Sequence, residues 1–504
     1  MLHIIKTKPS WATKGQKENK TQQDNVHQKS DSTEKKNFEI IINNSSEEQA
    51  IGQKSAAIPD GGYGWVIVVV CFLTSFCCWG GNAGFAVYLA NYVTENTFSG
   101  TNLDYAAIGG LAFGTGLLFA PVITYIIGLL GTNVVMFIGA CIQLAAMLLA
   151  SFSTKLWQIY LTQGVLMGFG LAVAFVPVPP VIPQWFDKKR SLAMGLGVGG
   201  SGAGGVMFNL AMQKILEVKS VRWALRAQAI ICFVLLVLSS VLIRTRNAHI
   251  KPVFKLFDKQ ILEFRVFWVF VGFLIFSMFG YVVVQYELAD ATMSLGYSAY
   301  QGSIASALIA TGAFFLRPAM GFFSDKFGCL SVGIIVYYLC GILTLAMWIP
   351  ARNLATIYAY AILCGGLMGY IWGFMGAVIP RMIGLRKASV TFGMSWMFLA
   401  SSAIVSPIIG LAVKQNNTHE PLSSKNHRKS EYIYAGVFAG LGFICCATCL
   451  VFVRGYIIAR DILIMLDEES DDIAVDVNED LLKYKVPFAL WMKHLFTIKT
   501  KNKV

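Results

Sequence analysis

The stretch AIPDGGYGWVIVVV, residues 57–70, ends a long polar segment and begins the first apolar run of the chain. It places Asp60, three glycines and two aromatic residues, Tyr63 and Trp65, directly before residues that belong in hydrocarbon. Aromatic side chains concentrate at the interface between membrane and water. An acid at this place can accept hydrogen bonds from the free N–H groups of the helix that follows. The pattern predicts the start of a transmembrane helix.

The composition agrees with an integral membrane protein. Of the 504 residues, 56% are hydrophobic and only 14% are charged, and the mean hydropathy is +0.59. A soluble chain carries about a quarter charged residues. The net charge of +13 lies in the tails and in short loops between apolar runs, where lysine and arginine face anionic lipid headgroups. The lipid bilayer is therefore an expected partner, and nucleic acid is not.

Twelve hydrophobic stretches are long enough to cross about 30 Å of hydrocarbon as helices. An even number of spans places both termini on one side, and the distribution of lysine and arginine moderately favours the cytoplasm for both. We therefore expect an all-α membrane protein with twelve transmembrane helices. The expected spans are residues 64–90, 104–130, 133–152, 156–182, 190–213, 223–243, 265–288, 299–324, 329–349, 353–379, 388–413 and 432–456.

The two halves of the chain repeat each other weakly. The second span ends FAPVITYIIGLLGTN and the eighth ends FLRPAMGFFSDKFGC, so that Pro121 and Gly131 have the same offset as Pro318 and Gly328. Many transporters are built by such duplication, with two bundles around a central site. The segment GFFSDKFG also resembles the loop motif of the major facilitator superfamily, where an acid at a helix end, here Asp325, braces the cytoplasmic side.

The expected organisation is thus two six-helix bundles joined by a basic loop, the major facilitator fold. Its parts are a disordered cytoplasmic N-terminal tail (1–60), an N-terminal bundle (61–243), a cytoplasmic central loop (244–264), a C-terminal bundle (265–456) and a cytoplasmic C-terminal tail (457–504).

A second block, QWFDKKRSLAMGLGVGGSGAGG at residues 184–205, leads from an inner loop into the fifth span. Together with PDGGYGW it resembles the two signature motifs of the monocarboxylate transporter family, and most closely the fungal branch. The first motif matches throughout, whereas Trp185 stands where the second motif usually has Tyr. The motif residues for which we expect a structural role are Asp60, Gly61, Gly62, Tyr63, Gly64, Trp65, Phe186, Lys188, Lys189, Arg190 and Gly195.

Arg317 is a charge within the eighth span, eight residues before Asp325 and so about 12 Å along the helix from its end. An arginine inside a membrane costs ~3 kcal/mol or more and is a functional hypothesis by default. A structural ion pair, or snorkelling toward the inside, is the alternative. The family resemblance implies that this Arg-Pro arginine holds the substrate carboxylate, for which a guanidinium offers a matching planar fork.

The chain departs from the proton-coupled members of that family in two places. The resemblance implies an Asp one turn before the arginine and a Lys late in the first span. This chain has Ala313 at the first place and reads GGNAGF, with Asn82, near the second. Other polar residues at core depth are then candidates for substrate contact. The predicted substrate-binding residues are Arg317, Asn82, Gln285 and Glu287.

Three further segments each allow two interpretations. The glycines of residues 195–205 either pack helices closely or form a wall beside the transport route. VPVPPVIP, residues 176–183, either kinks the end of the fourth span or lines a cavity, because its prolines remove backbone donors. The amphipathic basic segment at residues 481–504 lies either in a membrane surface or in solvent.

The sequence favours a secondary transporter or facilitator of a small organic solute that is anionic, aromatic or vitamin-like, and not a proton–lactate symporter. The alternative is a non-transporting nutrient sensor with the same fold. An enzyme is not expected, and neither a cofactor nor a metal, because paired catalytic carboxylates, a histidine-rich metal set and a nucleotide loop are missing. GVGGSGAGG lies within a membrane helix and follows no strand, so it does not indicate a phosphate loop. The plasma membrane is the expected location, with a vacuolar or other internal membrane as the alternative.

Overall fold

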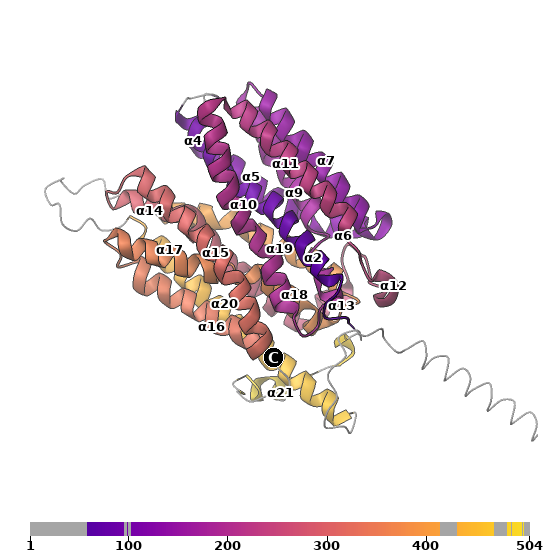
Figure 1. Cartoon of the computed structure of the whole chain (residues 1–504). Helices are drawn as coiled ribbons and strands as arrows, with labels where there is room; N and C mark the ends of the chain where they lie inside the picture. Colours follow the sequence, from indigo (N-terminus) through magenta and orange to yellow (C-terminus); the bar gives the residue numbers. More distant parts are fainter. Residues whose placement is uncertain are drawn as a thin grey trace, which may run out of the picture. The chain divides into compact units, whose positions relative to one another are not determined.

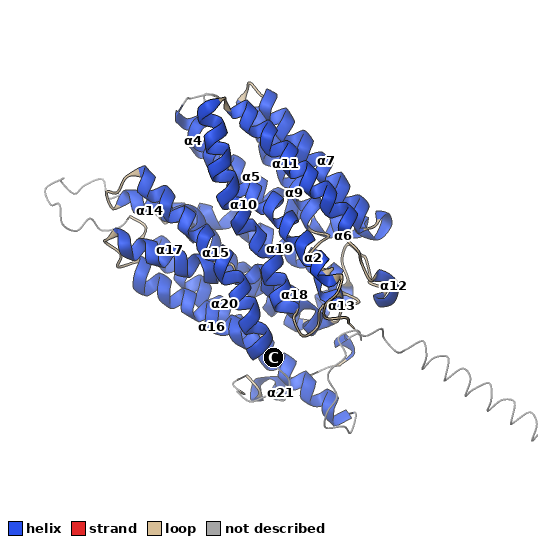
Figure 2. Ribbon diagram, viewed as in Figure 1, coloured by secondary structure: helices blue, strands red, loops and turns tan. Residues whose placement is uncertain are grey.

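The computed structural model describes residues 58–94, 98, 102–413, 431–467, 481–484, 486–495 and 497. The predicted disorder of the N-terminal tail concerns residues outside this part of the chain. All regular elements in the described residues are helices, so the all-α prediction is confirmed (Figure 2).

The first half of the chain begins with α2 and ends with α11 (Figure 1). Its elements are α2 (Gly64–Ser75), the π-helix η1 (Phe76–Gly80), α3 (Gly81–Ala83), α4 (Phe85–Thr94), α5 (Asn102–Leu118), α6 (Ala120–Leu130), α7 (Thr132–Phe152), α8 (Leu156–Ile159), the π-helix η2 (Tyr160–Leu166), α9 (Met167–Phe175), the 3₁₀-helix η3 (Ile182–Gln184), α10 (Arg190–Val218) and α11 (Val221–Leu242).

The central loop contains two short helices, and the second half follows it. These elements are α12 (Asn247–Ile250), α13 (Lys259–Glu263), α14 (Arg265–Ser294), α15 (Ala299–Phe327), α16 (Cys329–Leu343), the π-helix η4 (Thr344–Trp348), α17 (Leu354–Met368), α18 (Tyr370–Ile383), α19 (Ala388–Ala412), α20 (Ile433–Asp467), the 3₁₀-helix η5 (Leu481–Lys483) and α21 (Phe488–Lys493).

Eleven helical stretches of the described chain are long and apolar enough to cross a membrane. A twelfth is obtained if Ala107–Leu118 and Ala120–Leu130, which are bent by 50° relative to each other, form one span. The bend lies at Pro121, whose ring removes a backbone donor and crowds the preceding turn. The count agrees with the twelve spans expected from hydropathy.

Two helix ends differ from their predicted positions by about seven residues or more. The fourth span ends at Phe175 and not at residue 182, because the prolines that follow cannot continue the hydrogen-bond ladder. The last helix, α20, continues to Asp467 and not only to residue 456, so the segment assigned to the C-terminal tail begins as helix.

The two halves meet mainly where α10 packs against α15 and α18, and where α19 packs against α5 and α6. Glycines make the α10–α15 approach possible. A Cβ at Gly195 would lie 2.6 Å from the carbonyl oxygen of Arg317, and one at Gly202 would lie 2.9 Å from Phe314 Cβ. On another face of the same helix, a Cβ at Gly200 would collide with the carbonyl of Phe72 on α2. The glycine-rich segment is therefore a packing surface.

The described part of the C-terminal segment folds back onto α20. The Trp491 side chain is only 8% exposed, and its indole Nε1 donates to the carbonyl of Phe452 at 2.8 Å. Leu495 packs against the backbone at Gly455. Trp491 and Leu495 of this amphipathic segment are therefore buried against protein, whereas Phe488 is exposed.

Candidate functional site

Asp60 joins the two signature motifs through hydrogen bonds. Its carboxylate Oδ1 accepts from the backbone N–H groups of Asp187 at 2.7 Å and Lys188 at 2.8 Å, and its own N–H donates to the carbonyl of Trp185 at 3.0 Å. We expected Asp60 to satisfy donors at the start of its own helix, and this was wrong: α2 has no side-chain cap. Positive φ angles at Asp60 (51°) and Gly62 (59°) turn the chain between the carboxylate and α2.

The aromatic and glycine residues of the two motifs pack directly on each other. The rings of Trp65 and Phe186 lie 5.1 Å apart, and those of Tyr63 and Trp185 lie 5.8 Å apart. A Cβ at Gly64 would lie 3.0 Å from the Phe186 ring, so a larger residue would separate the motifs. The two motifs, more than a hundred residues apart in sequence, thus form a single packed cluster.

The start of α10 is held from both halves of the chain. Buried Arg190 donates from Nε to the carbonyl of Phe186 at 3.0 Å and pairs with Asp187 at 3.0 Å. The carboxylate of Asp325, at the end of α15, accepts from the N–H groups of Ser191 and Leu192, both at 2.9 Å. This acid is the brace that the loop motif implies. We call the end of the bundle that carries Asp60, Arg190 and Asp325 the motif end.

Arg317 lies between the two halves. Its side chain is 7% exposed, and one terminal nitrogen donates to the Val198 carbonyl at 3.1 Å and to the Ser201 hydroxyl, both on α10. On the other side, a Cβ at Gly369 would lie 2.5 Å from the guanidinium Nε. The guanidinium is therefore enclosed by α10 and by the break between α17 and α18. A small recess adjoins it, lined partly by Gly195.

Six aromatic rings meet between the halves, three from each, and we call them the aromatic layer. Trp372 on α18 stacks on Trp396 of α19 at 5.4 Å and contacts Trp79 of η1 at 5.3 Å and Tyr281 of α14 at 6.0 Å. Sequence reasoning missed this cluster, because no linear spacing connects its members. The layer consists of Trp79, Phe113 and Phe175 from the first half and Tyr281, Trp372 and Trp396 from the second.

Two of the other predicted site residues lie next to the aromatic layer. Gln285 is four residues after Tyr281 on α14, so it lies one turn farther from the motif end on the same helix face. Asn82 follows Trp79 by three residues on the first span, also on the far side from the motif end. Both side chains are half-buried.

Glu287 lies elsewhere. Its side chain is 3% exposed and packs against Gly410 on α19, where any Cβ would collide with the carboxylate. Measured along the helix axes from the motif end, Glu287 on α14 lies on the order of 18 Å farther away than Arg317 on α15. The structure thus does not bring Glu287 to the guanidinium.

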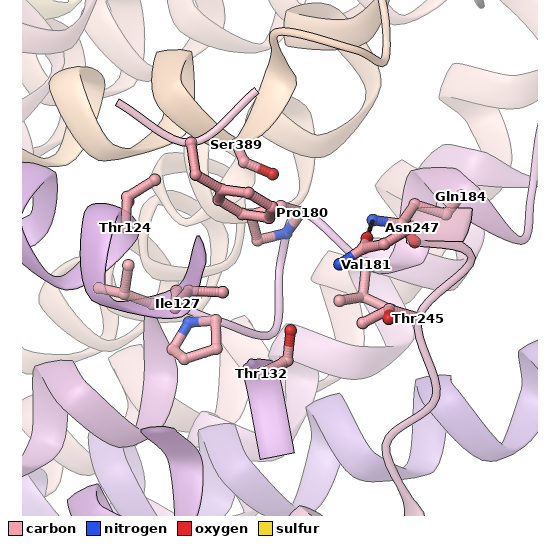
Figure 3. Close-up of a pocket in the computed structure, with 12 residues that line it drawn as sticks. Thr124, Ile127, Thr132, Pro180, Val181, Gln184, Thr245, Asn247 and Ser389 are labelled. Atoms are coloured by element: carbon pink, nitrogen blue, oxygen red, sulfur yellow. Dashed lines mark hydrogen bonds between the residues drawn. The ribbon is translucent and has the colours of Figure 1, made fainter. Parts of the chain in front are cut away.

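The proline-rich segment after α9 both ends its helix and lines a cavity (Figure 3). This small recess lies between the proline-rich segment, the central loop and α19. Gln184 Nε2 donates to Asn247 Oδ1 at 3.3 Å across its edge, and Ser389 contributes a hydroxyl from α19. Both interpretations of the proline segment therefore hold.

Comparisons with known proteins agree with this architecture. A family model described as "Major Facilitator Superfamily" matches residues 71–407. The chain is 45% identical over 424 residues to "Probable transporter MCH2" of Saccharomyces cerevisiae, covering 83% of this chain and 88% of that protein. It is 33% identical over 420 residues to "Uncharacterized transporter ESBP6" of the same yeast, covering 79% of this chain and 60% of that protein.

Among solved structures, the fold is similar to that of the transporter FucP in its outward conformation. The TM-score is 0.59 at 12% identity, over 77% of this chain and 99% of the other, a likeness that concerns the fold alone. Relatives and fold confirm a multi-pass membrane transporter and not an enzyme. The chain belongs to the Major Facilitator Superfamily.

Proposed function

We propose that this secondary transporter carries a small organic anion that Arg317 holds between the two halves, and that it is not a proton–lactate symporter. The observation that carries the proposal is the position of the guanidinium. It is buried, it reaches from α15 to the backbone of α10, and its Nε has no hydrogen-bond partner among the described residues. A carboxylate needs such a charged donor, because an anion without one is expensive in a medium of low dielectric constant.

The aspartate that proton coupling of the usual kind uses is missing one turn before Arg317. The residue one turn before Arg317 is buried Ala313, which has no titratable group. A symporter loads proton and anion together, so it needs a titratable group near the anion. We therefore propose a larger or differently charged solute than lactate, carried by facilitated diffusion. The membrane we propose is the plasma membrane, with the motif end and both termini in the cytoplasm.

The first test exchanges the charged group for one with a different shape. Arg317→Lys keeps the charge and loses the planar fork, so we expect transport of an anionic solute by purified protein in liposomes to fall at least tenfold at normal abundance. Arg226→Lys is the matched control, because Arg226 is a half-buried arginine that bonds Ser151 on the neighbouring helix within the first half. Unchanged transport in Arg317→Lys would contradict the proposal.

The second test measures lactate uptake at two values of external pH. We expect little uptake and no rise as the external pH falls. Glu287 is the residue through which the proposal can fail, since it is a buried carboxyl in the second half. Robust uptake that rises at low pH and disappears in Glu287→Gln would show that this acid replaces the missing aspartate.

A further inference from the structure

One member of the aromatic layer, Trp372, lies within one helical turn of the glycine that packs on Arg317. Gly369, which packs on the guanidinium Nε, precedes Trp372 by three residues, and the Trp372 N–H donates back to the Gly369 carbonyl. Tyr281 contacts the Trp372 ring. Rings from both halves and the buried charge therefore belong to one place in the bundle.

Three buried N–H donors at this place have no hydrogen-bond partner among the residues that the structure describes. They are the indole Nε1 groups of Trp79 and Trp396 and the Nε of Arg317. Trp396 is only 1% exposed, so water does not reach its indole. A buried donor without an acceptor costs about 1–3 kcal/mol, and most buried polar groups in native proteins have partners.

Three other indoles among the described residues have hydrogen-bond partners. Those of Trp185, Trp268 and Trp491 donate to the backbone carbonyls of residues 244, 262 and 452, at 3.0, 2.8 and 2.8 Å. Among the described residues, both buried indoles without a hydrogen-bond partner therefore lie in the aromatic layer. All three groups are hydrogen-bond donors, so a ligand that satisfies them must supply acceptor atoms such as carboxylate oxygens.

We propose that the aromatic layer and Arg317 form a binding site for a planar aromatic carboxylate. This inference rests on the proposed function and names the chemical class of its solute. An aromatic ring packs favourably against other aromatic rings through their quadrupoles, which a saturated ring of the same size does not. The carboxylate oxygens accept from the guanidinium and from the indole N–H groups. Asn82 and Gln285 lie at the rim on the side away from the motif end.

The test compares two anions of nearly equal size on the purified full-length protein. Calorimetric titration at pH 7 measures the Kd of benzoate and of cyclohexanecarboxylate, which are both ionised at this pH. We expect benzoate to bind at least tenfold more tightly. Benzyl alcohol, an aromatic compound without the charge, is expected to bind more weakly than benzoate. Equal affinity for the two anions, or no binding of benzoate, would overturn the inference.

Two conservative variants test the indole donors. Trp396→Phe and Trp79→Phe keep an aromatic ring and remove only the N–H group, so we expect the Kd of benzoate to rise roughly fivefold to tenfold in each, as one lost hydrogen bond implies. Trp491→Phe is the matched control, since its indole lies in the tail, and it should leave the Kd unchanged. An unchanged Kd in both layer variants would contradict the role of these donors. If either variant does not fold, the comparison of the two anions on the unaltered chain still decides.

Failure of this inference can be told from failure of the proposed function. Transport of a non-aromatic anion that Arg317→Lys abolishes, with no preference for benzoate, would overturn the aromatic site and leave the anion carrier standing. If Arg317→Lys leaves the transport of every anion unchanged, both fail.

Discussion

The positive φ angle of Asp60 determines the direction in which its carboxylate points. Aspartate and asparagine tolerate this left-handed backbone region better than most residues. The turn directs the carboxylate to the N–H groups of Asp187 and Lys188 instead of to α2. The residue therefore contributes twice, through its backbone conformation and through two charge-assisted hydrogen bonds.

Removing the Asp60 side chain is expected to destabilise the protein without altering solute preference. Hydrogen bonds to a charged group contribute about 1.5–3 kcal/mol, so Asp60→Ala should lower the melting temperature and the yield of folded protein. Asp60→Asn keeps an acceptor oxygen and tolerates the same φ, and we expect a smaller loss. Glu263→Ala is the control, because this acid forms only an exposed pair with Lys259. Normal abundance combined with a changed solute preference would contradict a structural role.

At the scale of elements, α10 is the helix on which both halves depend. It contacts α2 with one face and α15 with another, and glycines occur where the backbones approach each other most closely. Not all of these glycines are equivalent. A Cβ at Gly195 would lie 2.6 Å from a backbone carbonyl on α15, whereas one at Gly199 would lie 3.7 Å from the nearest atom, which is an ordinary contact.

This difference predicts opposite outcomes for two substitutions four residues apart. Gly195→Ala forces α10 away from α15 at Arg317, and overpacking of this kind costs about 1–3 kcal/mol. Gly199→Ala should be neutral or slightly stabilising, because alanine favours the helix. The measurement is the melting temperature of the purified variants. Equal melting temperatures for the two would show that the helices are not packed as described.

How much of these elements the sequence predicts depends on the range of the interactions. Hydropathy predicts the spans, the charge of Arg317 marks a candidate site, and prolines indicate a kink at the end of the fourth span. Three features depend on contacts between distant segments and were not predictable: the partner of Asp60, the hydroxyl of Ser201 beside the guanidinium, and the aromatic layer. Ser201 gave one signal, as a polar residue within a run of glycines.

At the scale of the whole bundle, the two halves are joined at the motif end. Asp325 bonds the start of α10, and in the central loop Val253 donates its N–H to the Arg386 carbonyl at 2.8 Å, just before α19. Thr124 on α6 touches Gly393 on α19. A transporter of this family works by rocking one bundle against the other around a central site, so these contacts must open during each cycle.

A disulfide across this contact should stop transport reversibly. A Cβ at Gly393 would lie 3.2 Å from Thr124 Cβ, near the separation of bridged cysteines. We expect Thr124→Cys combined with Gly393→Cys to lose transport on oxidation and to regain it on reduction. Leu111→Cys with Gly164→Cys, a pair within the first half at 3.5 Å, is the control and should retain transport when oxidised. Full transport by the oxidised, cross-linked pair would show that the motif end need not open.

The bond between Asp60 and Asp187 spans 127 residues of chain. During synthesis, at about 5–20 residues per second, the ribosome needs roughly 6–25 s to make the second partner after the first. During part of that interval the first span is already complete while the loop that fixes its start does not yet exist. A chain that stops before residue 185 leaves Asp60 and Gly64 without their partners. The contacts that hold the start of the first span can therefore form only after the loop before α10 has been synthesised.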